Sequence, residues 1–267
     1  MDILIDKVPT NQFEMKFLRF GKGKKNLVII PGLSIQSVMG SAEQIATSYA
    51  LMADEFTVYV FDRRLDLPQV YTVKDMAEDT VQAFYSVGLN DIYLFGASQG
   101  GMIALEIAIR YPELVKKIAL GSTSPVMCEN LNPVLNRWAH LAKYKHKKEL
   151  YLDFGEKIYP TDVFKQYKDA LIAASHTVTD DDFQHFIILV QGMRGFDVTD
   201  QLEMIQCPVL VIGVYDDRVL DSDMTLEIAK KLNIREDFEL FMYKDFGHAA
   251  FDTAPDYHER LYKFFLK

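Results

Sequence analysis

The sequence has little of what marks nucleic-acid-binding or membrane-spanning proteins. Its 267 residues carry a net charge of −9, so the basic excess that attracts a polyanion is missing and we expect no nucleic-acid partner. No apolar run reaches the roughly 20 residues that a membrane-spanning helix needs. The opening MDILIDKVPTNQF has neither a basic leader nor a long apolar core. We therefore expect a cytoplasmic protein with no membrane partner.

Cysteine is also scarce, which argues against a disulfide framework. Cys128 and Cys207 are far apart and show neither a Cys-X-X-Cys pair nor a metal-binding spacing, so we interpret them as buried or incidental thiols. No repeat of 20 to 50 residues is visible. The sequence gives no reason to expect a metal or a cofactor, and it does not indicate an oligomeric state.

What the chain does have is a series of short apolar runs separated by helical patterns. Hydrophobic residues make up 49% of the sequence, enough for a substantial core. The predicted strands are two within residues 3–20, joined near Asn11, followed by 26–30, 56–61, 92–95, 116–121, 209–213 and 238–243. Amphipathic or unbroken helical patterns follow several of them, including 73–87, 225–232 and the closing YHERLYKFF. This alternation predicts an α/β fold with a mostly parallel eight-stranded sheet flanked by helices.

The alternation stops after Ser122, where about 75 residues show only helical patterns before the next strand. We interpret residues 125–200 as a helical cap inserted into a core domain formed by residues 1–124 and 201–267. Because α/β sheets bind ligands at the carboxyl ends of their strands, we expect the cap to cover that edge as a lid. Its aromatic residues either line a pocket or form the core of the cap itself.

Ser98 lies at a sharp corner between a predicted strand and a predicted helix, in the segment IYLFGASQGGMIALEIAIR (92–110). The apolar start is typical of a buried strand, and the second part runs without a helix breaker until Pro112. Such a corner strains its central residue and needs neighbours with almost no side chain, which the flanking Gly-Ala and Gly-Gly provide. The serine hydroxyl would then stand above a helix N-terminus, where negative charge is favoured.

In this context the motif Gly96-Ala97-Ser98-Gln99-Gly100-Gly101 resembles the nucleophile elbow of the α/β-hydrolase family. The resemblance implies that Ser98 is a nucleophile and that two backbone N–H groups form an oxyanion hole. One would come from Gln99, after the nucleophile, and the other from Leu33, in the loop after an earlier strand. Pro31-Gly32 stands where many members carry His-Gly, a departure that keeps the backbone donor but removes a side chain that often braces the loop.

An acid and a base complete the arrangement that the resemblance implies, in the family's order Ser, Asp, His. Asp216 and Asp217 both follow the strand at 209–213. We favour Asp217 because Asp217-Arg218-Val219 is similar to the family's Asp-X-Val segment, and we leave Asp216 as the alternative. His248 stands in a Gly-His segment near the chain end, where the family's base is found.

The sequence thus predicts a serine hydrolase, similar to carboxylesterases, that cleaves a small, apolar carboxylic ester, thioester or lactone through an acyl-enzyme. A small-molecule substrate is the partner that this function implies. Because the fold serves many chemistries, two alternatives stay open. A C–C bond hydrolase or lyase using the same triad on a metabolite would be inactive on simple p-nitrophenyl esters. A non-catalytic ligand-binding protein of the same fold would escape labelling by a fluorophosphonate.

Overall fold

A computed structural model describes residues 1–10, 12–127 and 132–267; Asn11 and Cys128 therefore lie outside the described residues. Its centre is an eight-stranded sheet in the order β1-β2-β4-β3-β5-β6-β7-β8. The strands are β1 (Ile3–Pro9), β2 (Glu14–Phe20), β3 (Lys25–Ile30), β4 (Phe56–Arg64), β5 (Ile92–Ala97), β6 (Val115–Gly121), β7 (Val209–Val214) and β8 (Phe238–Tyr243). The two pairings that involve β2 are antiparallel and the others are parallel. The predicted fold class is confirmed.

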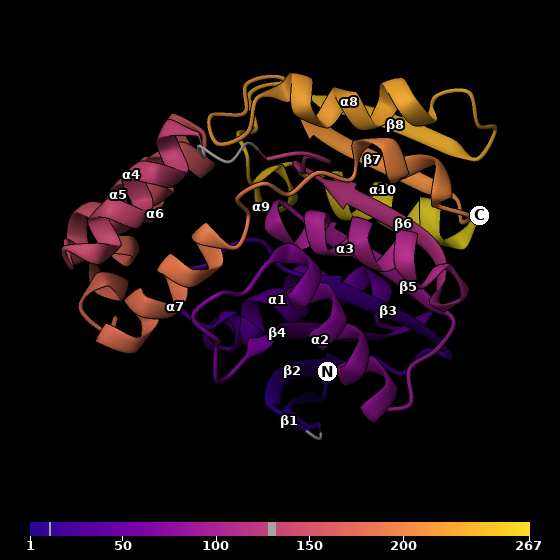
Figure 1. The fold of residues 1–267 in the computed structure, drawn as a ribbon, viewed down its shortest axis with the longest axis horizontal. Coiled ribbons are helices and arrows are strands. Elements are labelled where there is room, and N and C mark those ends of the chain that lie inside the picture. The colour runs from indigo at the N-terminus through magenta and orange to yellow at the C-terminus, as the bar shows by residue number, and fades with distance from the viewer. Residues whose placement is uncertain (11, 128–131) are drawn as a thin grey trace.

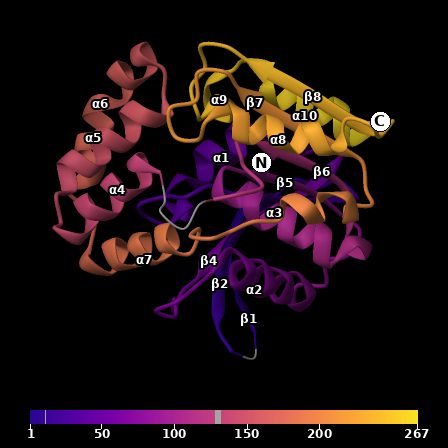
Figure 2. The same ribbon diagram turned by 45° about the horizontal axis from the view of Figure 1, so that its top comes forward.

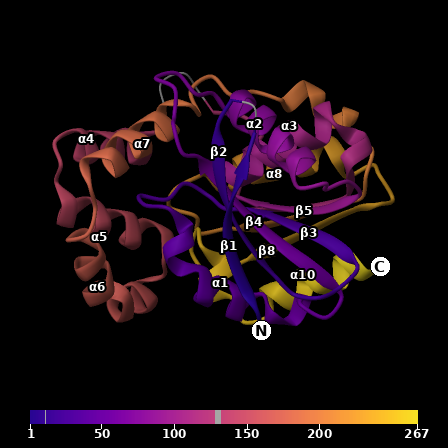
Figure 3. The same ribbon diagram turned by 90° about the horizontal axis from the view of Figure 1, so that it is seen from below.

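Helices cover both faces of this sheet, as Figure 3 shows. The longer helices of the core are α1 (Ala42–Ser48), α2 (Val73–Ser86), α3 (Gln99–Arg110), α8 (Ser222–Leu232) and α10 (Tyr257–Leu266). The short ones are α9 (Ala250–Thr253) and the 3-10 turns η1 (Val38–Ser41), η2 (Ala50–Met52), η3 (Pro112–Leu114) and η4 (Thr199–Met204). Helices α2, α3 and α8 pack on one face, and α1 and α10 pack on the other. The central strands are buried on both faces, which explains their nearly continuous apolar runs.

Four further helices lie between β6 and β7: α4 (Pro133–Lys143), α5 (Lys147–Ile158), α6 (Thr161–Ser175) and α7 (Asp180–Gln191). Figures 1 and 2 show them together at one end of the sheet. Hydrogen bonds tie them to the loops after the strands: Ala249 N–H donates to Ile158 O at 2.9 Å, and Asn132 Nδ2 donates to Val219 O at 2.7 Å. These helices occupy the stretch predicted to be a cap. Its boundaries at residues 125 and 200, and its action as a lid, stay predictions.

From the sequence alone, the charged run Asp62-Arg63-Arg64 after the apolar strand is typical of an ion-paired corner, but β4 continues through all three residues. The side chain of Arg63 is buried, and Arg64 Nη1 lies 3.3 Å from Asp79 Oδ2. Asp79 is only 8% exposed and also accepts a hydrogen bond from Tyr71 OH at 2.9 Å. β4 is thus longer than its apolar run, and its basic end pairs with an acid on α2.

Two further sequence features can be compared with the structure. Cys207 is buried, as predicted, and burial raises the pKa of its thiol to about 11. In the described part of the chain, no helix is both long enough and apolar enough to span a membrane. The cytoplasmic location stays a prediction.

His258 on α10 is a half-buried histidine, with a buried Nε2 atom, that we expect to make folding sensitive to acid. Its ring packs edge-on against Tyr49, with centroids 4.4 Å apart, and no described residue gives its Nε2 a hydrogen-bond partner. Burial lowers its pKa from 6.5 to about 4. The unfolded chain therefore binds the extra proton first, and stability present above pH 6.5 is lost as the pH falls toward 4, by up to about 3 kcal/mol.

The variant His258→Phe keeps a ring against Tyr49 but cannot titrate, so its free energy of unfolding is expected to fall less between pH 6.5 and 4 than that of the wild type. Urea unfolding at several pH values measures this. His176→Gln removes an exposed histidine and is the matched control, with the wild-type pH dependence expected. Equal pH dependence in His258→Phe and the wild type would contradict the interpretation.

Candidate active site

Ser98 stands at the junction of β5 and α3 with a strained backbone, at φ 53° and ψ −123°. A positive φ is uncommon for a residue other than glycine and costs free energy, so the surrounding structure must hold it. Ser98 N–H donates to Gly121 O at 2.8 Å, and Ser98 O accepts from Thr123 Oγ1 at 2.7 Å. These bonds to β6 and the residues after it fix the corner. The strand, turn and helix expected from the sequence are all present.

The glycines beside Ser98 are required by close packing. A Cβ atom on Gly100 would lie 2.0 Å from Ile30 O, and one on Gly96 would lie 2.4 Å from Gly100 O. Both contacts are with backbone atoms, which cannot move aside as a side chain can. The start of α3 therefore approaches the end of β3 as closely as it does only because these positions lack a side chain. This places the serine directly beside the loop after β3.

Asp217 and His248 form a buried hydrogen-bonded pair. Asp217 Oδ2 lies 2.7 Å from His248 Nδ1, and the two side chains are 2% and 5% exposed. Asp217 Oδ1 accepts from the N–H groups of Val219 and Leu220 at 2.8 and 2.9 Å. Because a carboxylate only accepts, the proton between the pair belongs to Nδ1, which leaves Nε2 of the neutral ring free to take a proton.

The alternative acid, Asp216, makes a different contact. Its Oδ1 accepts from the N–H of Asp245 at 2.9 Å, which ties the loop after β7 to the loop after β8. Of the two aspartates that the sequence left open, only Asp217 is bonded to His248 among the described residues.

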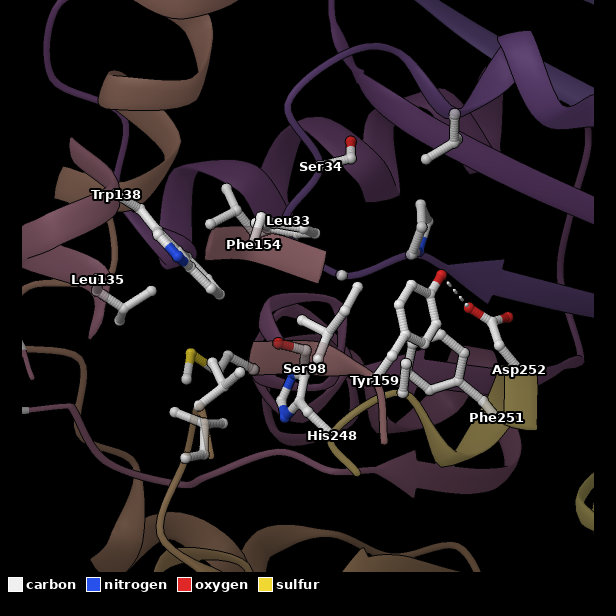
Figure 4. A pocket seen from close by; sticks show the side chains of 18 of the residues that line it. Leu33, Ser34, Ser98, Leu135, Trp138, Phe154, Tyr159, His248, Phe251 and Asp252 are labelled. Carbon is white, nitrogen blue, oxygen red and sulfur yellow. Dashed lines mark hydrogen bonds between the residues drawn. The ribbon is translucent and has the colours of Figure 1, made fainter. Parts of the chain in front are cut away.

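The side chains of Ser98 and His248 lie beside each other on the wall of one cavity (Figure 4). Among the described residues no hydrogen bond joins them, so the hydroxyl must approach the ring before a proton can pass. Hydrogen bonds of this kind are often long without substrate and tighten when substrate binds. The structure thus brings together the serine, the histidine and the aspartate that lie far apart in the sequence.

The two backbone donors expected to form an oxyanion hole flank Ser98. Gln99 is the first residue of α3, so its N–H has no acceptor within the helix. Leu33 follows Gly32, where an added Cβ would lie 3.1 Å from Ser98 Cβ. Leu33 and Ser98 line the same cavity. This arrangement could hold a negative oxygen next to the serine.

The cavity has a volume of about 270 Å³ and is largely apolar. The core contributes the loops after β3, β7 and β8, and the inserted helices contribute Trp138, Phe154 and Ile158 (Figure 4). Trp138 and Phe154 stack at a tilt, with ring centroids 4.6 Å apart. Phe183 and Phe186, by contrast, are buried away from the cavity. Some aromatic residues of the inserted helices therefore line the pocket, and others are buried among the helices themselves.

A buried polar link joins the serine corner to the inserted helices. Gln99 is 0% exposed; its Nε2 donates to Leu189 O of α7 at 2.8 Å, and its Oε1 accepts from Arg63 Nη2 at 3.2 Å. The same Arg63 nitrogen donates to Pro31 O at 2.8 Å, in the loop that carries Leu33. Burial lowers the pKa of Arg63, and the adjacent Asp62 raises it. One glutamine side chain thus spans β4, α3 and α7.

Gln99→Leu is expected to lower the free energy of unfolding by about 3 kcal/mol, because a buried guanidinium and a buried carbonyl would each lose a partner. Urea unfolding measures the change. Gln82→Leu replaces the same residue type at an exposed position of α2 and should change the free energy by less than about 0.5 kcal/mol. If the two variants were equally stable, the link would contribute nothing to folding.

Sequence reasoning missed Arg63, Tyr159 and Asp252, although each lies in or beside the site. Arg63 continues the two-residue alternation of its strand from Phe61, and that periodicity could have placed it on the buried face. Asp252 and Tyr159 line the cavity without any motif to mark them. No group of three or more His, Cys, Asp or Glu side chains that could hold a metal ion occurs in residues 1–10, 12–127 and 132–267.

Comparison with known families decides the classification. The family model described as serine aminopeptidase, S33, matches residues 22–253. The chain is an α/β-hydrolase of this family. The resemblance seen in the serine motif is therefore confirmed for the family and for the fold.

Relatives of this α/β-hydrolase include a protein of Pseudomonas savastanoi pv. phaseolicola named "Putative carbamate hydrolase RutD". The two sequences are 27% identical over 252 residues, and the alignment covers 86% of this chain and 88% of the relative. Among solved structures, MGS-M2, an α/β-hydrolase enzyme from a Medee basin deep-sea metagenome library, has a TM-score of 0.85 at 18% identity and 98% coverage of both chains. The enol-lactonase from Burkholderia xenovorans LB400 has a TM-score of 0.82 at 15% identity, covering 98% of this chain and all of its own. At these low sequence identities, the structural similarity shows a shared fold and nothing more.

Proposed function

We propose that this hydrolase cleaves a small, largely apolar carboxylic ester, thioester or lactone through an acyl-enzyme. The observation that carries the proposal is the buried Asp217–His248 pair beside Ser98 on the wall of a mostly apolar cavity. An imidazole held by a buried carboxylate, next to a half-buried serine hydroxyl on a strained backbone, is the arrangement that acyl transfer needs.

In this mechanism Ser98 Oγ attacks the carbonyl carbon while His248 Nε2 takes the hydroxyl proton. The negative charge that develops on the carbonyl oxygen is bound by the N–H groups of Leu33 and Gln99, worth about 3 kcal/mol for each donor. His248 then gives its proton to the leaving alcohol or thiol, and the acyl group stays on Ser98. A water, deprotonated by the same nitrogen, releases the acid. Asp217 orients the ring and balances its charge throughout.

The test is hydrolysis of p-nitrophenyl esters of increasing acyl length, combined with fluorophosphonate labelling. We expect one label for each chain and activity that is highest on short acyl chains, because the cavity of about 270 Å³ holds only a small group. Labelling without hydrolysis of any ester would favour a C–C bond hydrolase or lyase. Complete absence of labelling would favour a non-catalytic ligand-binding protein.

Similarity to proteins named as carbamate hydrolases supports a second candidate, cleavage of a carbamate at the same site. A carbamate carbonyl would be attacked by Ser98 and would develop the same negative oxygen, so the machinery would be unchanged. Nitrogen donation makes this carbonyl less reactive than that of an ester. Comparing kcat/KM for a p-nitrophenyl ester and for an unsubstituted p-nitrophenyl carbamate separates the candidates, since a carbamate hydrolase should turn over the carbamate repeatedly and without a long-lived acyl-enzyme.

A further inference from the structure

Asp252 places a carboxylate in the wall of the cavity that contains Ser98 and His248. It lies on the short helix α9, four residues after the histidine. Figure 4 shows it at one side of the cavity, next to Phe251 and joined to Tyr159. Most of the remaining wall is apolar, so this carboxylate is the feature that most changes which ligands the cavity can accept.

The carboxylate of Asp252 has no cationic partner among the described residues. The single hydrogen bond to it is a long one, from Tyr159 OH at 3.4 Å, and no lysine, arginine or histidine nitrogen of the described chain lies within 4.0 Å of its oxygens. The other titratable groups that sense its charge are the phenols of Tyr49 and Tyr257, both buried and both neutral at ordinary pH. A carboxylate in this position would gain from a positive charge on a ligand.

Asp252 is an exposed residue at the wall of the cavity, although many protein atoms lie around its carboxyl group. Loss of water from around it raises the pKa of Asp252 to about 6, with the hydrogen bond from Tyr159 acting in the opposite direction. The group is consequently ionised above this pH.

Aromatic rings stand next to this carboxylate. Tyr159 and Phe251 lie beside it, and Phe154 lines the same cavity (Figure 4). Ring faces attract cations, and quaternary ammonium groups are bound in proteins by aromatic residues in this way. A negative oxygen together with aromatic rings favours a cation with an apolar surface over an anion or a strongly hydrated neutral group.

We propose that Asp252 is a specificity-determining residue that selects substrates carrying an ammonium group, held between its carboxylate and the neighbouring rings while the scissile carbonyl lies at Ser98. This rests on the proposed function and narrows its substrate class to esters with a cationic end and an apolar spacer. A purely structural role, in which Asp252 only anchors Tyr159, predicts equal effects of its substitution on cationic and neutral substrates.

Two esters of nearly identical shape test the proposal: p-nitrophenyl 4-(trimethylammonio)butanoate and its neutral carbon analogue, p-nitrophenyl 5,5-dimethylhexanoate. A second pair, butyrylthiocholine and 3,3-dimethylbutyl thiobutyrate, places the charge on the leaving group instead. For at least one pair we expect the wild type at pH 8 to prefer the cationic member by about tenfold in kcat/KM, corrected for their intrinsic reactivity. Asp252→Asn should abolish most of this preference and leave the neutral ester within about threefold of the wild type.

Asp245→Asn is the matched control, because it removes the same charge three residues before His248 on an exposed site outside the cavity. It should keep the wild-type preference. The pH dependence adds a second readout, because the trimethylammonium group does not titrate and any effect of pH on the shared catalytic machinery cancels in the ratio of the two esters. The ratio of their kcat/KM values should therefore rise between pH 5 and 7 in the wild type and stay flat in Asp252→Asn.

Binding of hexyltrimethylammonium, measured by calorimetry, separates failure of this proposal from failure of the hydrolase assignment. Weaker binding to Asp252→Asn than to the wild type supports the cationic site even if neither ester is cleaved. Equal preference ratios and equal binding in the two proteins would overturn it and would leave ester hydrolysis untouched.

Discussion

Ser98→Ala is expected to lower kcat for ester hydrolysis by about 10⁵-fold or more and to abolish fluorophosphonate labelling. The variant keeps the Cβ atom and the backbone bonds to Gly121 and Thr123, so the strained corner should persist while the attacking oxygen disappears. Initial rates with a short-chain p-nitrophenyl ester and intact-protein mass spectrometry measure the two effects.

Ser34→Ala is the control for labelling, since it removes another hydroxyl group from the same cavity. It should still take one label for each chain. Circular dichroism and thermal unfolding should show both variants folded. A label that survives in Ser98→Ala would move the nucleophile elsewhere and would overturn the proposed mechanism.

Asp217→Asn is expected to reduce kcat by about 10⁴-fold, whereas Asp216→Asn should stay within about threefold of the wild type. The carboxylate of Asp217 accepts from His248 through one oxygen and from two backbone N–H groups through the other. In an asparagine the backbone groups hold the remaining oxygen, which turns the amide NH₂ toward the ring. That donor favours the wrong histidine tautomer, with the proton on Nε2.

The substitution at Asp216 is the matched control because it has the same chemistry at the adjacent residue. An asparagine there can still accept the hydrogen bond from the N–H of Asp245. Steady-state kinetics on one ester compares the two variants directly. A reversed order, with Asp216→Asn inactive and Asp217→Asn active, would assign the acid to Asp216.

The parts of this fold that could be predicted are those whose cause is local. Each buried strand is an apolar run of suitable length, and the glycines around Ser98 reveal the tight corner before any coordinates are known. Long-range partners could not be predicted in the same way. From the sequence alone, the basic end of β4 is equally compatible with a charged corner. Its contacts with Gln99 and Asp79 show why Arg63 is buried and Arg64 is partly buried.

The same distinction between local and long-range causes applies to the site. Ser98, Asp217 and His248 could be predicted because each lies in a short segment that resembles a segment of the family. The resemblance also predicts the loops in which they lie. Asp252 and Tyr159 belong to no such segment. They meet because α9 and the end of α5 converge on one cavity, a property of the packed chain that composition and spacing do not contain.

The hydrogen bond from Ala249 N–H to Ile158 O has a consequence for engineering this enzyme. Gly247 allows the close approach, since a Cβ there would lie 2.8 Å from the same carbonyl oxygen. Exchanging α4–α7 for the corresponding helices of a relative would therefore disturb the backbone on both sides of His248. A chimera designed to alter substrate choice should retain residues 158–160 together with the segment 247–249, so that the graft begins and ends away from His248, the proposed general base.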